Sequence, residues 1–315
     1  AGEGGAERML RIAAVDIGTN SILLTIAEVQ GEEIRPLCER SRITRLGEGL
    51  NATGKLSAEP MRRSLDALRD LLEDIRQHQV EQVVAVGTEV LRKAQNAQEF
   101  LQACQQLGLS VEVISGEREA YLSYLSVSRD PLFKQRADRL SILDVGGGST
   151  EVSRGSGGVL QASRSYPIGA VRLTEAHLHS DPPTAEEVHA LQETVRRHLQ
   201  GEQPLGEGEY LVGVGGTFVN LASLHAGHQE YSPERVHGAT LTREEMYGLA
   251  QQLCALPLAQ RRQLPGIEPD RAPVLHAGAL IAATAMECLH AGGIAVSMRG
   301  LRWGLVYELA DAYRH

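Results

Sequence analysis

Lysine is scarce in this chain of 315 residues and occurs only at positions 55, 93 and 134, so arginine carries almost all of the positive charge. Arginine suits bidentate contacts with phosphate, although a compositional bias of the source organism explains most of these residues equally well. The net charge of -9 gives no reason to expect nonspecific binding to nucleic acid. An anionic ligand would therefore need a local basic lining or a metal ion.

Cysteines and uninterrupted apolar segments are also few. The four cysteines, at positions 38, 104, 254 and 288, form no close pair, which argues against a disulfide framework or a cysteine zinc site. The longest apolar region, residues 277–296, is interrupted by Glu287, His290 and a glycine pair, so it predicts a buried helix followed by a strand. Residues 1–8 are polar and contain no apolar signal-peptide core. We therefore expect a cytoplasmic protein that does not span a membrane.

One motif is present twice. The stretch VDIGTNSIL occupies residues 15–23, and LDVGGGSTE occupies residues 143–151. The two share an aspartate, a glycine and a serine at equal spacing: Asp16, Gly18 and Ser21 in the first, Asp144, Gly146 and Ser149 in the second. A single glycine turn of this kind is usually structural, whereas two equal copies indicate a shared function.

Each copy has the composition of a phosphate-binding loop. Glycine permits the positive φ angles and the close approach that let backbone N–H groups converge on an anion, and hydroxyl and amide side chains add donors. The residues expected to bind phosphate are Thr19, Asn20, Ser21, Gly146, Gly147, Gly148, Ser149 and Thr150. A leading aspartate repels phosphate unless a divalent cation lies between them. Asp144, with Asp16 assisting, is therefore expected to bind Mg²⁺ or Mn²⁺.

Better-known motifs do not describe these loops. Neither is a Walker A loop, since no glycine-lysine-serine follows, and neither is a dinucleotide fingerprint, since each leads into a strand. The eleven histidines show no metal-binding spacing such as HExxH. No pairing of a nucleophile with a base emerges either, so we prefer direct attack by water to a covalent intermediate.

Hydrophobic periodicity predicts strands alternating with helices along the whole chain. Strands are expected at 10–15, 21–29 and 34–42, and the order strand, loop, strand, strand restarts at the second motif. This pattern predicts an α/β fold of two duplicated halves with largely buried sheets and a cleft between the halves.

Further blocks accompany the two motifs in a fixed order: TRLGEGL, VGTEVLRKAQN, ISGEREA, GVGGTF, VHG and SMRGLRWGL. From residue 11 to residue 314 the chain resembles the exopolyphosphatase/guanosine pentaphosphate phosphatase (Ppx/GppA) family, within the actin, Hsp70 and sugar-kinase superfamily. It departs from the family pattern at Met298 and Trp303, where acidic residues are usual. It also stops where longer relatives continue into a helical region, and so resembles the short, two-domain form.

The resemblance implies two duplicated actin-like (ribonuclease H-like) domains flanking an interdomain cleft, with residues 9–120 and 301–315 in one and 121–300 in the other. It implies an exopolyphosphatase that removes terminal phosphate from inorganic polyphosphate with Mg²⁺ or Mn²⁺. Alternatives are a guanosine pentaphosphate (pppGpp) phosphohydrolase and, from another class, a nucleotide-binding sensor or phosphotransferase. The oligomeric state stays open, with a homodimer among the options.

The resemblance also assigns roles to acidic residues. In ISGEREA it makes Glu119 the base that activates water. Glu117 is the local rival, but an acidic residue in the first turn of a helix is explained by the helix dipole. Glu151, at the end of the second motif, is expected to hold the metal or to position water. Its alternative is a solvated carboxylate at a strand edge.

Two arginines complete the expected site. Arg45 in TRLGEGL and Arg92 in VLRKAQN would clamp the phosphate chain, although an isolated surface arginine is more often merely solvated. The block GVGGTF lies where kinase-like relatives hold a nucleotide, and here we expect a cleft wall or a secondary phosphate contact. His237 in VHG is expected to make a structural hydrogen bond.

Overall fold

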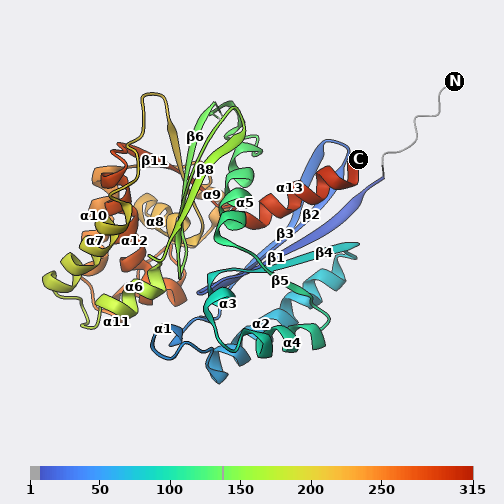
Figure 1. Cartoon of the computed structure of the whole chain (residues 1–315), viewed down its shortest axis with the longest axis horizontal. Coiled ribbons are helices and arrows are strands. Elements are labelled where there is room, and N and C mark those ends of the chain that lie inside the picture. The colour runs from blue at the N-terminus through green and yellow to red at the C-terminus, as the bar shows by residue number, and fades with distance from the viewer. Residues whose placement is uncertain (1–7, 137, 315) are drawn as a thin grey trace. The chain divides into compact units, whose positions relative to one another are not determined.

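The computed structural model describes residues 8–136 and 138–314, which fall into two compact units, each with its own sheet and core (Figure 1). The first unit ends at Ile114 and resumes at Leu301, and the second runs from Ser115 to Gly300. This division precedes helix α5 (Gly116–Ser128), whereas a boundary after residue 120 would cut that helix. Among the described residues, no helix combines the length and apolar character needed to cross a membrane.

The first unit is built on a five-stranded sheet in the order β3-β2-β1-β4-β5. Its strands are β1 (Leu10–Ile17), β2 (Ser21–Gln30), β3 (Glu33–Ile43), β4 (Gln82–Gly87) and β5 (Val111–Val113). Its helices are α1 (Leu50–Thr53), α2 (Ala58–Gln77), α3 (Glu89–Lys93), α4 (Ala97–Gln106) and α13 (Leu301–Arg314). Strands β1 to β3 form an antiparallel meander, while β4 pairs parallel with β1 and β5 parallel with β4.

The second unit repeats this order as β8-β7-β6-β9-β11 and adds β10 beside β11. Its strands are β6 (Arg139–Val145), β7 (Thr150–Ser156), β8 (Val159–Tyr166), β9 (Tyr210–Val214), β10 (Thr240–Thr242) and β11 (Gly293–Ser297). Its other helices are α6 (Ala170–His177), α7 (Ala185–Leu199), α8 (Gly216–Ala226), α9 (Pro233–Val236), α10 (Arg243–Cys254), α11 (Leu258–Arg261) and α12 (Ala272–Cys288), with 3₁₀ turns at Lys134–Arg136 and Pro269–Arg271. The predicted duplicated α/β fold is confirmed.

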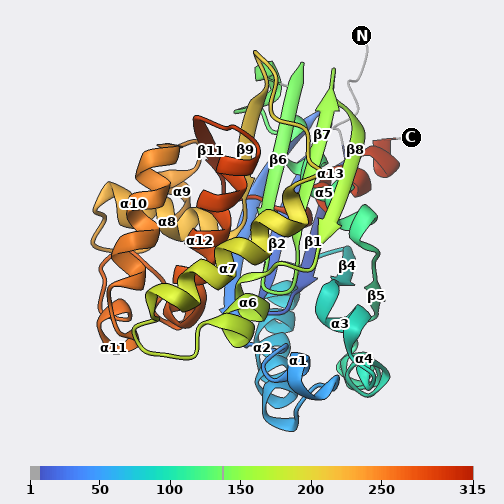
Figure 2. The same cartoon turned by 60° about the vertical axis from the view of Figure 1, so that its left-hand side comes forward.

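Both sheets are covered on two faces, which explains their long apolar strands. In β1, the side chains of Val15 and Ile17 join the core under α2 and α4, whereas Leu10 and Ile12 pack against α13. In the second unit, Leu143 and Val145 of β6 face the large core built by α7, α8 and α12 (Figure 2). The alternate residues Leu140 and Ile142 belong to the core that contains Tyr124 and Val127 of α5. Because successive residues point to opposite faces of a sheet, this alternation places Asp144 on the α5 face.

Candidate active site

The second motif brings two carboxylates together on one face of the sheet. Strands β6 and β7 pair so that Asp144 lies directly opposite Glu151, and the period of two puts both side chains on the face covered by α5. Helix α5 supplies the third carboxylate, Glu119, from its first turns. The N-cap hydroxyl of Ser115 accepts a hydrogen bond from the backbone N–H of Arg118 at 3.1 Å, and this bond fixes the start of the helix.

Two of the three carboxylates, Glu119 and Glu151, are buried, Asp144 is partly buried, and the three repel one another. Glu119 is 7% exposed and Glu151 is 1% exposed. Burial, opposed by a hydrogen bond from Ser123, and the charge of Glu119 raise the pKa of Asp144 to about 7. Burial, the charges of Glu119 and Asp144, and a hydrogen bond with Glu119 hold the pKa of Glu151 well above its usual range. The cluster therefore retains a proton near neutral pH unless positive charge is supplied.

Two serines that the sequence analysis did not single out hold these carboxylates. Ser123 Oγ donates to Asp144 Oδ2 at 2.7 Å, and Ser165 Oγ donates to Glu151 Oε2 at 2.7 Å. Ser123 lies one helical turn after Glu119, and Ser165 is the register partner of Glu151 on β8. Ser123 could have been predicted from the sequence, because it follows Glu119 by four residues on a helix. Ser165 could not, because its place beside Glu151 depends on the register of β7 and β8.

The loop between β6 and β7 is fixed mainly by its backbone. The N–H of Gly146 donates to the carbonyl of Ser149 at 2.9 Å, and Arg172 Nε donates to the carbonyl of Gly148 at 3.0 Å. A Cβ on Gly169 would lie 2.1 Å from the Gly147 carbonyl oxygen, so glycine is required there by close approach. The Thr150 hydroxyl, which was expected to contact phosphate, donates to the carbonyl of Ile168 and supports the loop.

The loop of the first unit contains the same turn. The N–H of Gly18 donates to the carbonyl of Ser21 at 3.0 Å, as Gly146 does to Ser149. Asn20 is 5% exposed, and both polar atoms of its side chain lack a hydrogen-bond partner among the described residues. A buried amide without partners is costly, so Asn20 has unused capacity for an anion. Thr19 is 8% exposed, and Asp16 precedes the turn at the end of β1.

The two predicted phosphate-clamping arginines belong to the first unit and differ in their surroundings. Arg45 follows β3 with a left-handed φ of 51°, and its buried Nε makes no hydrogen bond to a described residue. Arg92, in α3, donates through Nη1 to the carbonyl of Ile114 at 2.6 Å and pairs with Glu89 at 3.1 Å. Arg45 is therefore less engaged in internal contacts than Arg92.

Of the remaining residues that the sequence analysis discussed, Glu117 is exposed, while His237 and Trp303 make hydrogen bonds within their own units. Glu117, the rival of Glu119, is exposed on α5. His237 Nε2 lies 3.0 Å from Asp130 Oδ2, and its Nδ1 accepts a hydrogen bond from the backbone N–H of Met298. Trp303 is 1% exposed and donates through Nε1 to Glu39 at 2.6 Å, so this departure from the family pattern is part of the first unit's core. No set of three or more His, Cys, Asp or Glu side chains in the described ranges is arranged to hold a metal ion.

Two sheets of equal strand order, each with an aspartate-glycine turn between its first two strands, define a duplicated actin-like fold. The match to the Ppx/GppA phosphatase family model spans residues 25–313, and the chain belongs to that family. It is a phosphatase.

Its relatives carry two activity names. The chain is 34% identical over 286 residues to exopolyphosphatase 2 of Mycobacterium tuberculosis. The matched region covers 87% of this chain and 89% of that protein. It is 30% identical over 307 residues to guanosine-5'-triphosphate,3'-diphosphate pyrophosphatase of Photobacterium profundum. The matched region covers 96% of this chain and 60% of that protein.

Solved structures agree with the fold. A Ppx/GppA family member from Aquifex aeolicus superimposes with a TM-score of 0.81 at 34% identity, covering 98% of this chain and 100% of the other. An exopolyphosphatase from Cytophaga hutchinsonii gives a TM-score of 0.86 at 26% identity, covering 96% of this chain and 98% of the other.

Proposed function

We propose that this phosphatase is an exopolyphosphatase, which hydrolyses the terminal phosphoanhydride bond of inorganic polyphosphate and releases orthophosphate. The observation that carries the proposal is the cluster of Glu119, Asp144 and Glu151 beside the loop of residues 146–150, in which the two glutamates are buried and Asp144 is partly buried. A carboxylate base next to a phosphate-binding loop is what water attack on a phosphoanhydride requires. The relative from Mycobacterium tuberculosis named exopolyphosphatase supports polyphosphate as the substrate.

Glu119 is the residue to which we assign general-base catalysis. Its carboxylate orients the attacking water and accepts a proton as the new P–O bond forms and the bridging P–O bond breaks. The burial of Glu119 and the exposure of Glu117 support this choice between the two glutamates. In the metal-free protein a proton on Glu151 is shared with Glu119 through a hydrogen bond, and that proton would be displaced when a cation binds, which leaves Glu119 as the base.

The acidic donors fit a hard divalent cation. Asp144 and Glu151 face each other across β6 and β7, and their pKa values are raised first by desolvation and then by the neighbouring negative charge, which a cation would neutralise. Mg²⁺ is usually held by one or two carboxylates together with substrate phosphates and water, so a three-residue cage is not required. We assign Asp144 and Glu151 as ligands of Mg²⁺ or Mn²⁺, and the assistance expected from Asp16 stays a prediction from the sequence. The ion would offset negative charge on the transferred phosphoryl group.

We assign phosphate contacts in each unit by itself. The unpartnered amide of Asn20 supports a phosphate contact in the first loop, together with Thr19 and Ser21. In the second unit the corresponding contacts come from the loop of residues 146–150. Arg45 and Arg92 add local positive charge in a chain whose net charge is -9.

The test compares phosphate release from long-chain polyphosphate, tripolyphosphate, pppGpp and ATP, each with Mg²⁺ and with excess chelator. We expect long-chain polyphosphate to give the highest kcat/KM and chelator to abolish turnover. Turnover unchanged in chelator would refute the metal assignment. Preference for ATP with transfer to an acceptor would indicate a phosphotransferase, and binding without turnover would indicate a sensor.

A second substrate has an observation in its favour. The relative from Photobacterium profundum is named for guanosine pentaphosphate hydrolysis and matches 96% of this chain. Since pppGpp also ends in a phosphoanhydride, the same base and loops could hydrolyse it. A higher kcat/KM for pppGpp than for every polyphosphate length would make it the principal substrate.

A further inference from the structure

The turn that carries Arg45, residues 44–48, is hydrogen-bonded to the first phosphate-binding loop, residues 18–21. The backbone N–H groups of Thr44 and Arg45 both donate to the carbonyl of Asn20, at 3.1 and 3.0 Å. The N–H of Gly47 donates to the carbonyl of Thr19 at 3.0 Å. Arg45 also has a positive φ, which a side chain with a Cβ adopts only when its surroundings hold it there. The position of Arg45 is therefore set by whatever holds this turn.

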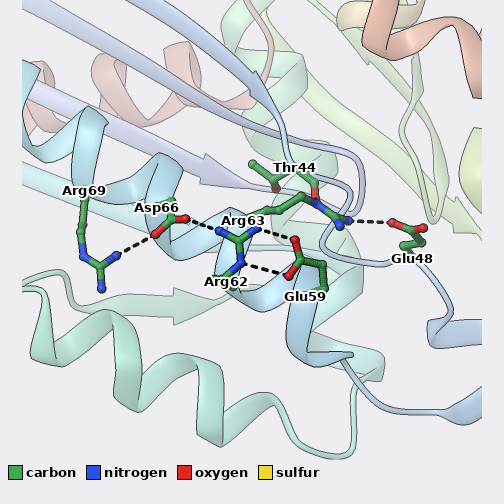
Figure 3. A network of polar contacts seen from close by, with 7 residues as sticks. All are labelled: Thr44, Glu48, Glu59, Arg62, Arg63, Asp66 and Arg69. Atoms are coloured by element: carbon green, nitrogen blue, oxygen red, sulfur yellow. Dashed lines mark hydrogen bonds and ion pairs between the residues drawn. The ribbon is translucent and has the colours of Figure 1, made fainter.

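Helix α2 holds the turn from the other side, as Figure 3 shows. Arg63 Nε donates to the carbonyl of Thr44 at 3.0 Å, and Arg63 Nη2 donates to Glu48 Oε2 at 2.6 Å. Ser64 Oγ adds a buried hydrogen bond to Thr44 Oγ1 at 2.8 Å. One planar guanidinium thus contacts the turn at its first residue and at Glu48, whereas a lysine could keep only the ion pair with Glu48.

Glu48 stands between two arginines. The same oxygen that accepts from Arg63 at 2.6 Å lies 3.7 Å from Arg45 Nε, which is beyond hydrogen-bond distance. The side chains are accessible enough to move, being 55% exposed in Glu48 and 36% exposed in Arg45. If Arg63 released it, the Glu48 carboxylate would be drawn onto Arg45, where it would occupy donors that a phosphate needs.

We propose that Arg63 is a positioning residue for polyphosphate binding, because by retaining Glu48 it keeps that carboxylate from closing on Arg45. The inference rests on the proposed function, since it takes Arg45 as a phosphate contact. Arg63 itself touches no substrate in this scheme. Its effect is to keep the Arg45 guanidinium available to a phosphate, so its loss acts on substrate affinity and leaves the chemical step intact.

The chain provides a matched control one residue away. Arg62 lies on the same helix and donates to Glu59 Oε2 at 3.0 Å and to Asp66 Oδ2 at 2.7 Å, so it stabilises only α2 (Figure 3). Arg62→Ala removes the same charge and two ion pairs without touching the turn. A change in net charge or helix stability would therefore appear in both variants, and an effect through Glu48 only in Arg63→Ala.

The experiment measures KM and kcat for long-chain polyphosphate, and the melting temperature, in wild type, Arg62→Ala, Arg63→Ala, Arg63→Lys and the double variant Arg63→Ala/Glu48→Gln. We expect Arg63→Ala to raise KM roughly two- to fivefold with kcat unchanged, because the partly exposed Glu48 carboxylate would then pair with Arg45 in place of Arg63. Arg62→Ala should match wild type. Arg63→Lys keeps a cation beside Glu48 and should stay near wild type, and the double variant should recover the wild-type KM.

Four results would overturn the inference. Arg63→Ala with the KM of Arg62→Ala would show that Arg63 has no effect on binding. A double variant as weak as Arg63→Ala, or Arg63→Lys as weak as Arg63→Ala, would show that Glu48 is not the route. Wild-type protein that neither binds nor hydrolyses polyphosphate would refute the proposed function and this inference together, whereas the first three outcomes leave the proposed function intact.

Discussion

The two loops of this molecule are built alike and equipped differently. Each closes with the same bond from a glycine N–H to a serine carbonyl, and each joins the first two strands of a sheet of the same order. The register partner of Asp144 is Glu151, whereas the partner of Asp16 is Leu23. One copy therefore pairs two carboxylates where the other pairs a carboxylate with an apolar side chain.

The helices that cover the equivalent faces differ in the same sense. Helix α5 presents Glu119 and Ser123 to the carboxylates of the second sheet. In the first unit α13 packs against β1, its Arg302 Nε donates to Thr25 Oγ1 of β2 at 2.8 Å, and its Trp303 donates to Glu39 of β3. These contacts fasten the helix to its own strands. The same scaffold is therefore present twice, and only the second copy places a carboxylate of the covering helix beside those of its sheet.

The largest expected effect tests whether the base belongs to the second copy. Glu119→Gln keeps the shape of the side chain but removes the base, so kcat should fall by about 10²- to 10⁴-fold with KM little changed. Glu117→Gln is the matched control, because it removes an exposed glutamate two positions earlier and should change kcat far less. Steady-state kinetics on polyphosphate with Mg²⁺ measures both.

Two outcomes would revise the assignment. A large loss in Glu117→Gln with little change in Glu119→Gln would make Glu117 the base. If neither variant lowered kcat, the water would be activated elsewhere, with Glu151 the next candidate.

A smaller effect, on the free energy of unfolding, is expected from two glycine substitutions that compare how tightly the two loops are packed. Gly169→Ala would place a Cβ 2.1 Å from the Gly147 carbonyl oxygen, which is backbone of the second loop and cannot turn aside. Gly47→Ala would place a Cβ 2.3 Å from Thr19 Cγ2, the end of a side chain that can rotate. We expect Gly169→Ala to lower the free energy of unfolding by ~1–3 kcal/mol and Gly47→Ala to cost less. Denaturant unfolding of both variants measures this, and equal losses would contradict the difference in packing.

A separate comparison is the pH dependence that the carboxylates of the second copy impose on stability. The pKa of Asp144 is raised from 3.8 to about 7, so in that window the folded protein retains a proton that the unfolded chain has released. The free energy of unfolding of the metal-free protein should therefore contain a contribution that decreases as pH rises from about 4 to about 7 and is constant above that range.

Asp144→Asn removes this contribution. Thermal unfolding of wild type and variant in chelator should show the variant gaining stability relative to wild type as pH rises through the window. A difference between the two proteins that does not change with pH would contradict the raised pKa.

The sequence was sufficient for the duplicated fold because both motifs carry identical spacings beside apolar strands. It also singled out the three carboxylates, since Asp144 and Glu151 belong to one short motif and Glu119 to a nearby block. It did not predict Ser165, Glu48 or Arg63. Ser165 depends on the register of β8, and Arg63 reaches Glu48 across a connection that only the packing of α2 defines. Contacts of this kind depend on tertiary geometry, which local periodicity does not encode.

The buried position of Trp303 has a practical consequence. It is the only tryptophan of the chain, and it lies on α13 in the first unit, where it donates a hydrogen bond to Glu39. Its intrinsic fluorescence, excited apart from the eight tyrosines, therefore reports the environment of the first unit alone. An emission shift during denaturation that precedes or follows the loss of helical circular dichroism would reveal that the two halves unfold separately, without any added label.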